Sequence, residues 1–191
     1  MNNYEYIVAS LPVVDERSAG KVDADEIVAE IRSQLSGSDC SLLDTFIQGC
    51  SREAISPELY ERATRSSNRF IREYFTFDLA VRNAKVDYLN KALGRPYGQD
   101  KVILGEGEPD FDEREKVDAV LNGSDILERE RGLDDIMWEK IDDITRMDIF
   151  DIEFILGFVA KLMIIDRWNK LDPQTGREMF RRLVEEIRKT R

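Results

Sequence analysis

Acidic side chains gather in two stretches of the sequence where they would suit metal or acid–base chemistry. The first is the run from Glu106 to Glu113. The second comprises Glu139, Asp142, Asp143 and Asp148. Clustered carboxylate oxygens are the ligands that Ca²⁺ and Mg²⁺ prefer, and a desolvated pair of carboxyl groups serves acid–base catalysis. The first run lacks the spacing of an EF-hand loop, because Gly107 and Pro109 separate its acids. We therefore interpret it as a solvated loop, and the second group as a solvated helix face.

The counts of histidine and cysteine restrict the chemistry further. The 191 residues include no histidine and two cysteines, Cys40 and Cys50. Catalytic triads and metal sites that need an imidazole are therefore excluded. If one helix joins the cysteines, its rise of 1.5 Å per residue separates them by about 15 Å, which is too far for a disulfide. Two free thiols fit a reducing cytoplasm. These counts favour a protein that is not itself an enzyme, with no cofactor and no bound metal.

One charged pair lies among apolar neighbours. Asp78 and Arg82 are four residues apart on an expected helix, with Lys85 following. Such a pair stabilises an isolated helix by only a few tenths of a kcal/mol. Phe77 and Val81 beside it have the pattern of buried residues, however. We therefore predict that Asp78 and Arg82 form a structural ion pair.

The elements that position these residues are predicted to be helices, because apolar residues recur at helical spacing along the chain. Residues 4–9 fit either a short strand or the first turn of a helix. Capping residues and breakers set the other limits. The expected helices are 23–35, 38–49, 57–93 with an interruption at 66–68, 113–121, 124–132, 133–147, 151–171 and 173–189. Gly157 within the seventh predicts a close helix crossing. The fold class is all-α, a multi-helix bundle.

A stretch rich in glycine, proline and acids divides the chain. It predicts an N-terminal helical unit at 1–95 with a long central helix, an acidic linker at 96–112, and a C-terminal helical unit at 113–191. The segment 75–81, FTFDLAV, resembles 150–156, FDIEFIL, at an offset of 75 residues. This similarity suggests that the two units are related copies.

The overall charge argues against two classes of partner. Lysine and arginine total 28 against 39 acids, for a net charge of −11. A nucleic-acid-binding surface needs basic residues to displace counterions, so we expect no nucleic acid. The longest nearly apolar stretch, 154–165, is shorter than the roughly 20 residues of a membrane span. We expect a cytoplasmic protein with no direct membrane insertion.

Two segments carry a family resemblance. The opening YEYIVASLP at 4–12 resembles the start of small bacterial proteins of unassigned activity, whose genes lie among those of the V-type (A/V-type) ATP synthase. The segment 74–85, YFTFDLAVRNAK, is similar to a helix start in the central-stalk connector of V-type ATPases, the component designated C or d. In that fold an acid opens a long helix, and an arginine follows one turn later.

The resemblance implies an all-helical, non-catalytic component of a proton- or sodium-translocating ATPase that is similar to this connector. In that family, the connector joins the central shaft to the membrane ring. The implied partners are therefore the shaft and membrane-ring subunits, and the implied location is the cytoplasm, peripheral to the cytoplasmic membrane through those subunits.

Two other functions remain open from the residues alone. The alternative is a soluble helical protein–protein adaptor unrelated to the ATPase, with binding faces near Tyr60 or Trp168. A further hypothesis is a Mg²⁺-dependent enzyme that uses the carboxylates of Glu139, Asp142 and Asp143. Tight metal binding, seen as a raised melting temperature, would distinguish the enzyme.

Overall fold

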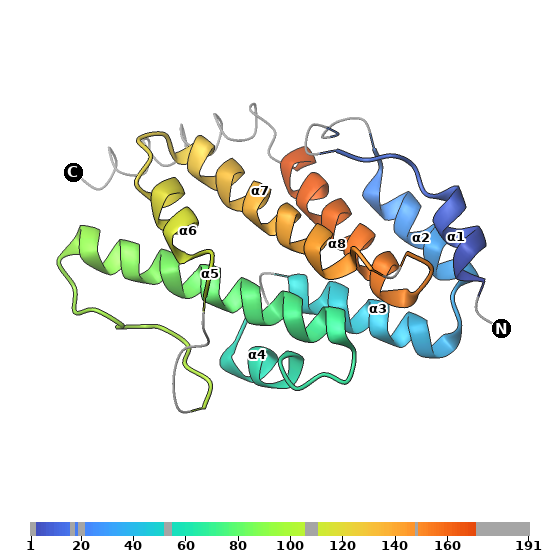
Figure 1. Ribbon diagram of the computed structural model, residues 1–191, viewed down its shortest axis with the longest axis horizontal. Helices are drawn as coiled ribbons and strands as arrows, with labels where there is room; N and C mark the ends of the chain where they lie inside the picture. Colours follow the sequence, from blue (N-terminus) through green and yellow to red (C-terminus); the bar gives the residue numbers. More distant parts are fainter. Residues whose placement is uncertain are drawn as a thin grey trace, which may run out of the picture.

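The computed structural model describes residues 3–15, 18, 22–51, 55–105, 111–147 and 149–170. Within these ranges the chain forms eight α-helices and no β-strand, which confirms the all-α multi-helix prediction (Figure 1). None of these helices is both long and apolar enough to cross a membrane. The helix expected at 173–189 lies outside the described residues.

The first three helices are α1 (Tyr4–Ser10), α2 (Ala24–Gln34) and α3 (Gly37–Cys50). Residues 4–9 are therefore helical, and Ile7 of α1 is buried in the core. The side chains of Asp23 and Ser36 cap α2 and α3 by accepting hydrogen bonds from backbone N–H groups of the first turn. Both cysteines lie on α3, and both are free thiols.

The middle of the chain forms a short helix and a long one, α4 (Pro57–Ala63) and α5 (Arg69–Leu93). Ser56 caps α4, and Pro57 occupies its first position, where a missing N–H costs nothing. Asn68 caps α5. Helix α5 ends at Gly94, whose φ of 65° lies in the left-handed region that glycine adopts without strain. It crosses most of the molecule (Figure 1).

The last described helices are α6 (Arg114–Leu121), α7 (Ile126–Thr145) and α8 (Ile152–Asn169). The expected break near Gly132 is wrong, because α7 is continuous and Asp125 caps its start. Gly132 serves packing instead. A Cβ at this position would lie 2.8 Å from Cγ1 of Val120 on α6, so a larger residue would force the helices apart.

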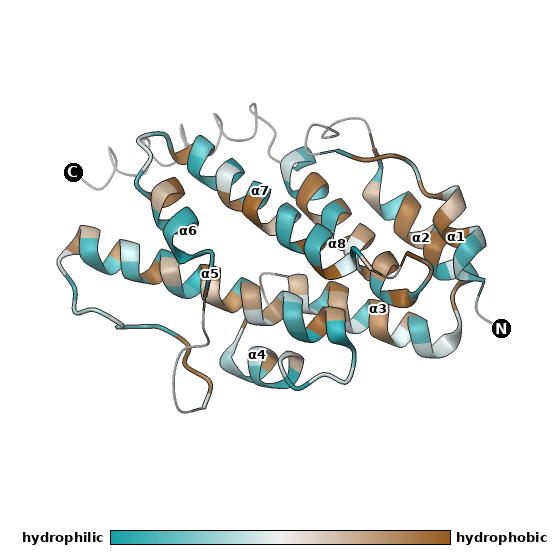
Figure 2. Cartoon of the chain, in the orientation of Figure 1, coloured by the Kyte–Doolittle hydropathy of each residue, from teal (hydrophilic) through white to brown (hydrophobic). Residues whose placement is uncertain are grey.

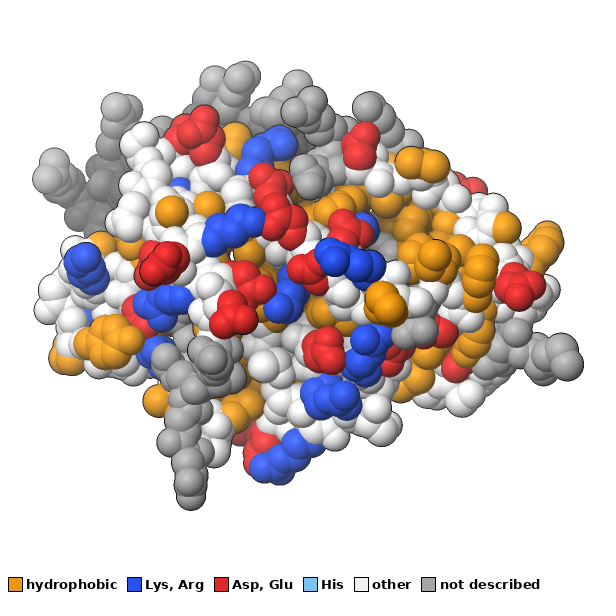
Figure 3. Space-filling model, viewed as in Figure 1, with side chains coloured by type: hydrophobic (Ala, Val, Ile, Leu, Met, Phe, Trp, Pro, Cys, Tyr) orange, Lys and Arg blue, Asp and Glu red, His pale blue; other side chains and the backbone are white. Residues whose placement is uncertain are grey.

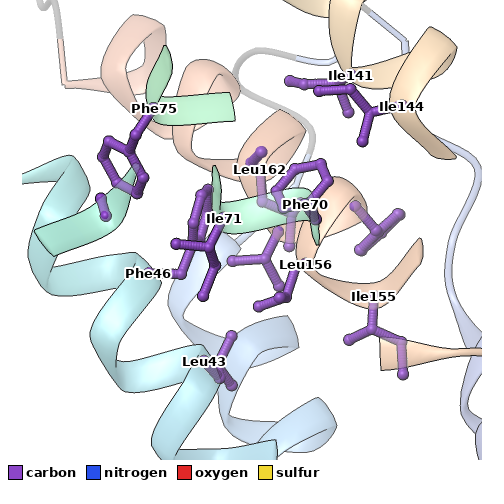
Figure 4. Close-up of a cluster of buried hydrophobic side chains, with 14 of the residues drawn as sticks. Leu43, Phe46, Phe70, Ile71, Phe75, Ile141, Ile144, Ile155, Leu156 and Leu162 are labelled. Atoms are coloured by element: carbon purple, nitrogen blue, oxygen red, sulfur yellow. The ribbon is translucent and has the colours of Figure 1, made fainter. Parts of the chain in front are cut away.

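The main hydrophobic core joins α3, α5, α7 and α8, as Figure 4 shows. Phe46 of α3 meets Phe70 and Phe75 of α5 in edge-to-face contacts, with ring centroids 5.5 and 5.8 Å apart. The predicted close crossing at Gly157 is confirmed, because a Cβ there would lie 2.5 Å from Cγ2 of Thr145. Brown, apolar residues are concentrated where α1, α2, α3 and α8 meet (Figure 2).

This core contains residues from both sides of the stretch 96–112. Ile31 and Leu43 come from the N-terminal side, and Ile141 and Leu156 from the C-terminal side. A second cluster joins α5 to α6 and α7 through Phe77, Val81, Val117, Leu121, Leu133 and Ile136, among others. The two units expected from the sequence therefore share their buried surface.

The C-terminal half of α5 buries polar residues that the sequence analysis did not single out. Asn83, Asp87 and Asn90 are all buried, whereas the apolar Leu89 is exposed. The segment after Gly94 returns along this face of the helix (Figure 1). It covers the face with backbone groups, which need polar partners, so polar rather than apolar side chains are buried there.

Candidate functional site

The predicted pair of Asp78 and Arg82 forms within the described structure. Nε of Arg82 donates to Oδ2 of Asp78 at 2.6 Å, and the hydroxyl of Tyr60 on α4 donates to the same oxygen at 2.5 Å. The Asp78 side chain is 17% exposed and that of Arg82 is 42% exposed. That the pair of Asp78 and Arg82 stabilises the fold stays a prediction. Tyr60 is buried, so its own side chain is not part of an exposed face.

A second ion pair, between Asp134 and Arg167, lies close to the first. Asp134 of α7 accepts hydrogen bonds through Oδ2 from Arg167 and, at 2.8 Å, from Nε1 of Trp168, both at the end of α8. The guanidinium of Arg131 lies 4.4 Å from the centroid of the Trp168 ring. The two Asp–Arg pairs, together with Cys50, Tyr74, Met137 and Met163, line a cavity of about 130 Å³. We call it the ion-pair cavity.

Burial controls the protonation of the groups around this cavity. It raises the pKa of Cys50 to about 12, and the carboxylate of Asp78 adds to that shift. Burial and Asp78 also raise the pKa of Tyr60, and burial raises the pKa of Asp134 against the opposing charge of Arg167. Near neutral pH, Cys50 is therefore a thiol and Tyr60 a phenol, and neither is an activated nucleophile.

The second acidic group is distributed among separate ion pairs. Glu139 pairs with Lys116, Asp142 with Lys161 and Asp143 with Arg146. Asp148 lies outside the described residues. Within the described ranges no three acidic or sulfur-containing side chains come together as metal ligands. The geometry therefore gives no support to a Mg²⁺ site at these carboxylates.

The acidic run falls mostly outside the described residues, which resume at 111. Glu113, its last acid, accepts a hydrogen bond from Nζ of Lys140 at 2.9 Å. This contact attaches the start of α6 to α7. Lys85, noted beside Arg82 in the sequence, donates instead to Glu130 of α7 at 2.8 Å.

A buried polar cluster on α5 was missed by the sequence analysis. Asn83 exchanges two hydrogen bonds with the backbone of Val102, through its Nδ2 at 2.8 Å and its Oδ1 at 3.1 Å. Asp87 accepts from Nζ of Lys101 at 2.9 Å, and Asn90 donates to the carbonyl of Gln99 at 2.7 Å. The spacing of Asn83, Asp87 and Asn90 places them on one helix face, and this spacing was the available signal.

An apolar groove lies between α1, the segment after it, and α8. Its cavity of about 260 Å³ is lined by Val8, Leu11, Val13, Val14, Phe154 and Phe158, with further contacts. Val13 is 99% exposed. The adjoining α7–α8 loop exposes Met147, Ile149 and Phe150. Figure 3 shows apolar side chains gathered over this part of the molecule. An exposed apolar patch rimmed by charge is typical of an interaction site.

Comparison with known proteins gives one match. A family model described as Protein of unknown function (DUF2764) matches residues 50–191. The chain belongs to this family. The match includes α5, α7 and α8, and with them both ion pairs of the cavity. No curated protein and no solved structure matches the chain significantly.

Proposed function

We propose that this DUF2764 protein is a non-catalytic structural or assembly component of a V-type (A/V-type) ATPase, resembling the central-stalk connector. The observation that carries a role in protein contact is the apolar groove between α1 and α8. A nearly fully exposed valine beside two phenylalanines is costly to keep in water and becomes favourable when a partner covers it.

The state of the polar groups supports a role without catalysis. The acids Glu139, Asp142 and Asp143 are each neutralised by a basic partner, and the thiol of Cys50 is held protonated by burial. The assignment to the ATPase itself rests on the resemblance of residues 4–12 and 74–85. The occupant that we propose for the groove is an apolar helix face of a shaft subunit.

The test is a pull-down of the tagged chain from gently solubilised native membranes, read by mass spectrometry. We expect the catalytic and shaft subunits to be recovered in a fixed ratio. Recovery of the chain alone would overturn the assignment. Recovery with unrelated soluble partners would instead support the helical adaptor.

A charged substitution tests whether the groove makes the contact. Val13→Asp should abolish recovery of the ATPase subunits, because it places a charge in the proposed interface. The matched control is Ile126→Asp, since Ile126 is also exposed, at 75%, but starts α7 away from the residues that line the groove. If Val13→Asp and Ile126→Asp recovered the ATPase subunits equally well, another surface would make the contact.

A further inference from the structure

Helix α8 is apolar around most of its circumference, because residues 154–160 and 162–165 are all apolar or glycine. Helices α2, α3, α5 and α7 pack against it. Near its start, however, Phe154 and Lys161 are partly exposed and line the apolar groove. A helix that is apolar on all sides is normally covered on all sides. The open face of α8 therefore indicates that a further element covers it.

The segment that follows α8 has the apolar spacing that such a groove accepts. Residues 171–191 lie outside the described part of the chain, and their sequence predicts a helix at 173–189. Amphipathic helices bind hydrophobic grooves through apolar side chains at positions i, i+3, i+4 and i+7. The segment has apolar residues at this spacing, namely Phe180, Leu183, Val184 and Ile187.

The length of the segment matches the path back along α8. Pro173 cannot continue the helix that ends at Asn169, so a turn is expected between them. Helices joined by a short turn pack as antiparallel neighbours. At a rise of 1.5 Å per residue, a helix at 173–189 measures about 24 Å, and Phe154 lies about 22 Å from Asn169 along α8. A reversed helix therefore reaches the groove from the end of α8.

The charge of the segment favours the same contact. Residues 171–191 contain six basic and four acidic side chains, whereas the whole chain has a net charge of −11. On the groove side, Asp142 is in the lining, and the exposed Glu5 lies one turn before Val8 on α1. Exposed charges add little affinity, but they steer an apolar face into place.

We propose that residues 173–189 occupy the apolar groove of the free protein as a helix antiparallel to α8. The segment then covers Val13, which is otherwise almost fully exposed. The inference rests on the proposed function in one respect, because an ATPase subunit that binds the groove must first displace the segment. A segment that covers the groove nine-tenths of the time lowers the apparent affinity for that subunit about tenfold.

Disulfide formation in the full chain tests the packing without any ATPase. In a background of Cys40→Ala and Cys50→Ala, Val13→Cys is combined with one cysteine in the segment. The four positions to be tried are Phe180→Cys, Leu183→Cys, Val184→Cys and Ile187→Cys. We expect mild oxidation to join at least one pair within a single chain, as read by mass spectrometry, because a disulfide needs Cα atoms within about 7 Å.

The matched control moves the first cysteine away from the groove. Ile126→Cys replaces Val13→Cys in the same four combinations, since Ile126 is also exposed but is not part of the groove lining. These combinations should stay reduced. The proposal would be overturned if no combination with Val13→Cys formed a disulfide, if Ile126→Cys reacted as readily, or if the disulfide joined two copies of the chain.

A charged substitution in the segment tests the displacement. Leu183→Asp should raise the recovery of ATPase subunits about tenfold at limiting concentration, because the charge releases the segment from the groove. Gln174→Asp adds the same charge outside the apolar positions and should leave the recovery unchanged. Equal recovery by Leu183→Asp and the unmodified chain would overturn the displacement. A disulfide without recovery of ATPase subunits by any variant would support the packing and overturn the proposed function.

Discussion

The two halves of α5 are both buried, but different interactions hold them. The N-terminal half contributes Phe70, Ile71 and Phe75 to a core shared with other helices. The C-terminal half contributes Asn83 and Asp87, which bind the returning segment around residues 99–102. Apolar contacts are non-directional and add up with area, whereas buried polar contacts depend on every partner being present. The two halves should therefore respond differently to substitution.

The largest effect is expected in the apolar half. Phe70→Ala should lower the free energy of unfolding by about 4 kcal/mol, because Phe70 is fully buried and its removal leaves a cavity. Urea denaturation measures the loss. Phe150→Ala is the matched control, since Phe150 is 57% exposed and should cost far less. Similar losses in the two variants would contradict the described packing.

The next effect concerns the buried charges of the polar half. Asp87→Ala should lower the free energy of unfolding by about 3 kcal/mol, because it removes a carboxylate that pairs with the buried side chain of Lys101, which is 2% exposed. The double variant Asp87→Leu with Lys101→Met should be more stable than Asp87→Ala. Combining Phe46→Ala with Phe70→Ala should instead cost more than either alone. Denaturation curves of all these variants would show whether the halves differ as we expect.

Asn83→Ala should lower the free energy of unfolding by about 2 kcal/mol, since it leaves two backbone groups of Val102 without their partners. Hydrogen exchange gives a specific measurement, because the amide of Val102 should lose protection in Asn83→Ala. Asn90→Ala removes only a bond to Gln99 and should leave that amide protected. Unchanged exchange at Val102 in Asn83→Ala would show that the returning segment is held by other contacts.

The ion-pair cavity lies between the two halves, and its thiol makes stability depend on pH. In the folded state the pKa of the Cys50 thiol is about 12, whereas the ordinary pKa of a cysteine thiol is 9.0. Folding therefore favours the protonated thiol. The contribution of this thiol to the free energy of unfolding is fully present below pH 9 and falls as the pH rises toward 12. The expected loss between about pH 8 and about pH 10 is about 1.4 kcal/mol. Cys50→Ala should remove this loss, and Cys40→Ala should retain it.

The smallest effect is expected at Arg82. Arg82→Ala should lower the free energy of unfolding by about 0.5 kcal/mol, because the Arg82 side chain is 42% exposed and water screens its bond to the mostly buried Asp78. Arg65→Ala, which breaks the exposed pair with Glu61, is the control and should have no measurable effect. An unchanged melting temperature in Arg82→Ala would remove the structural role that we predict for the pair.

Local signals predicted most of the helix limits. Ser56 with Pro57 set the start of α4, Gly94 set the end of α5, and Asp23 set the start of α2. These signals act through backbone groups within one turn, so neighbouring residues suffice to recognise them. Gly132 was misread as a break because its propensity is unfavourable in isolation, whereas the approach of α6 requires a small residue at that position.

The candidate sites were less predictable. Asp78 and Arg82 were identified because they are one turn apart on one helix. The sequence analysis did not identify the pairing of Asp134 with Arg167, because 33 residues separate them in the chain. On α5, the apolar Leu89 is exposed whereas its polar neighbours Asp87 and Asn90 are buried. Periodicity identifies the faces of a helix, but it does not say which of them meets a backbone segment and which meets other side chains.

The sequence by itself therefore determined the all-α class, the caps of several helices and the close crossing at Gly157. Only the tertiary structure decided that two ion pairs face one cavity, that polar residues of α5 are buried, and that an apolar groove opens beside Val13. The physical reason is the separation along the chain of the residues that interact. Capping and helix propensity act within a turn, whereas cavities and buried ion pairs depend on residues that approach only after the helices pack.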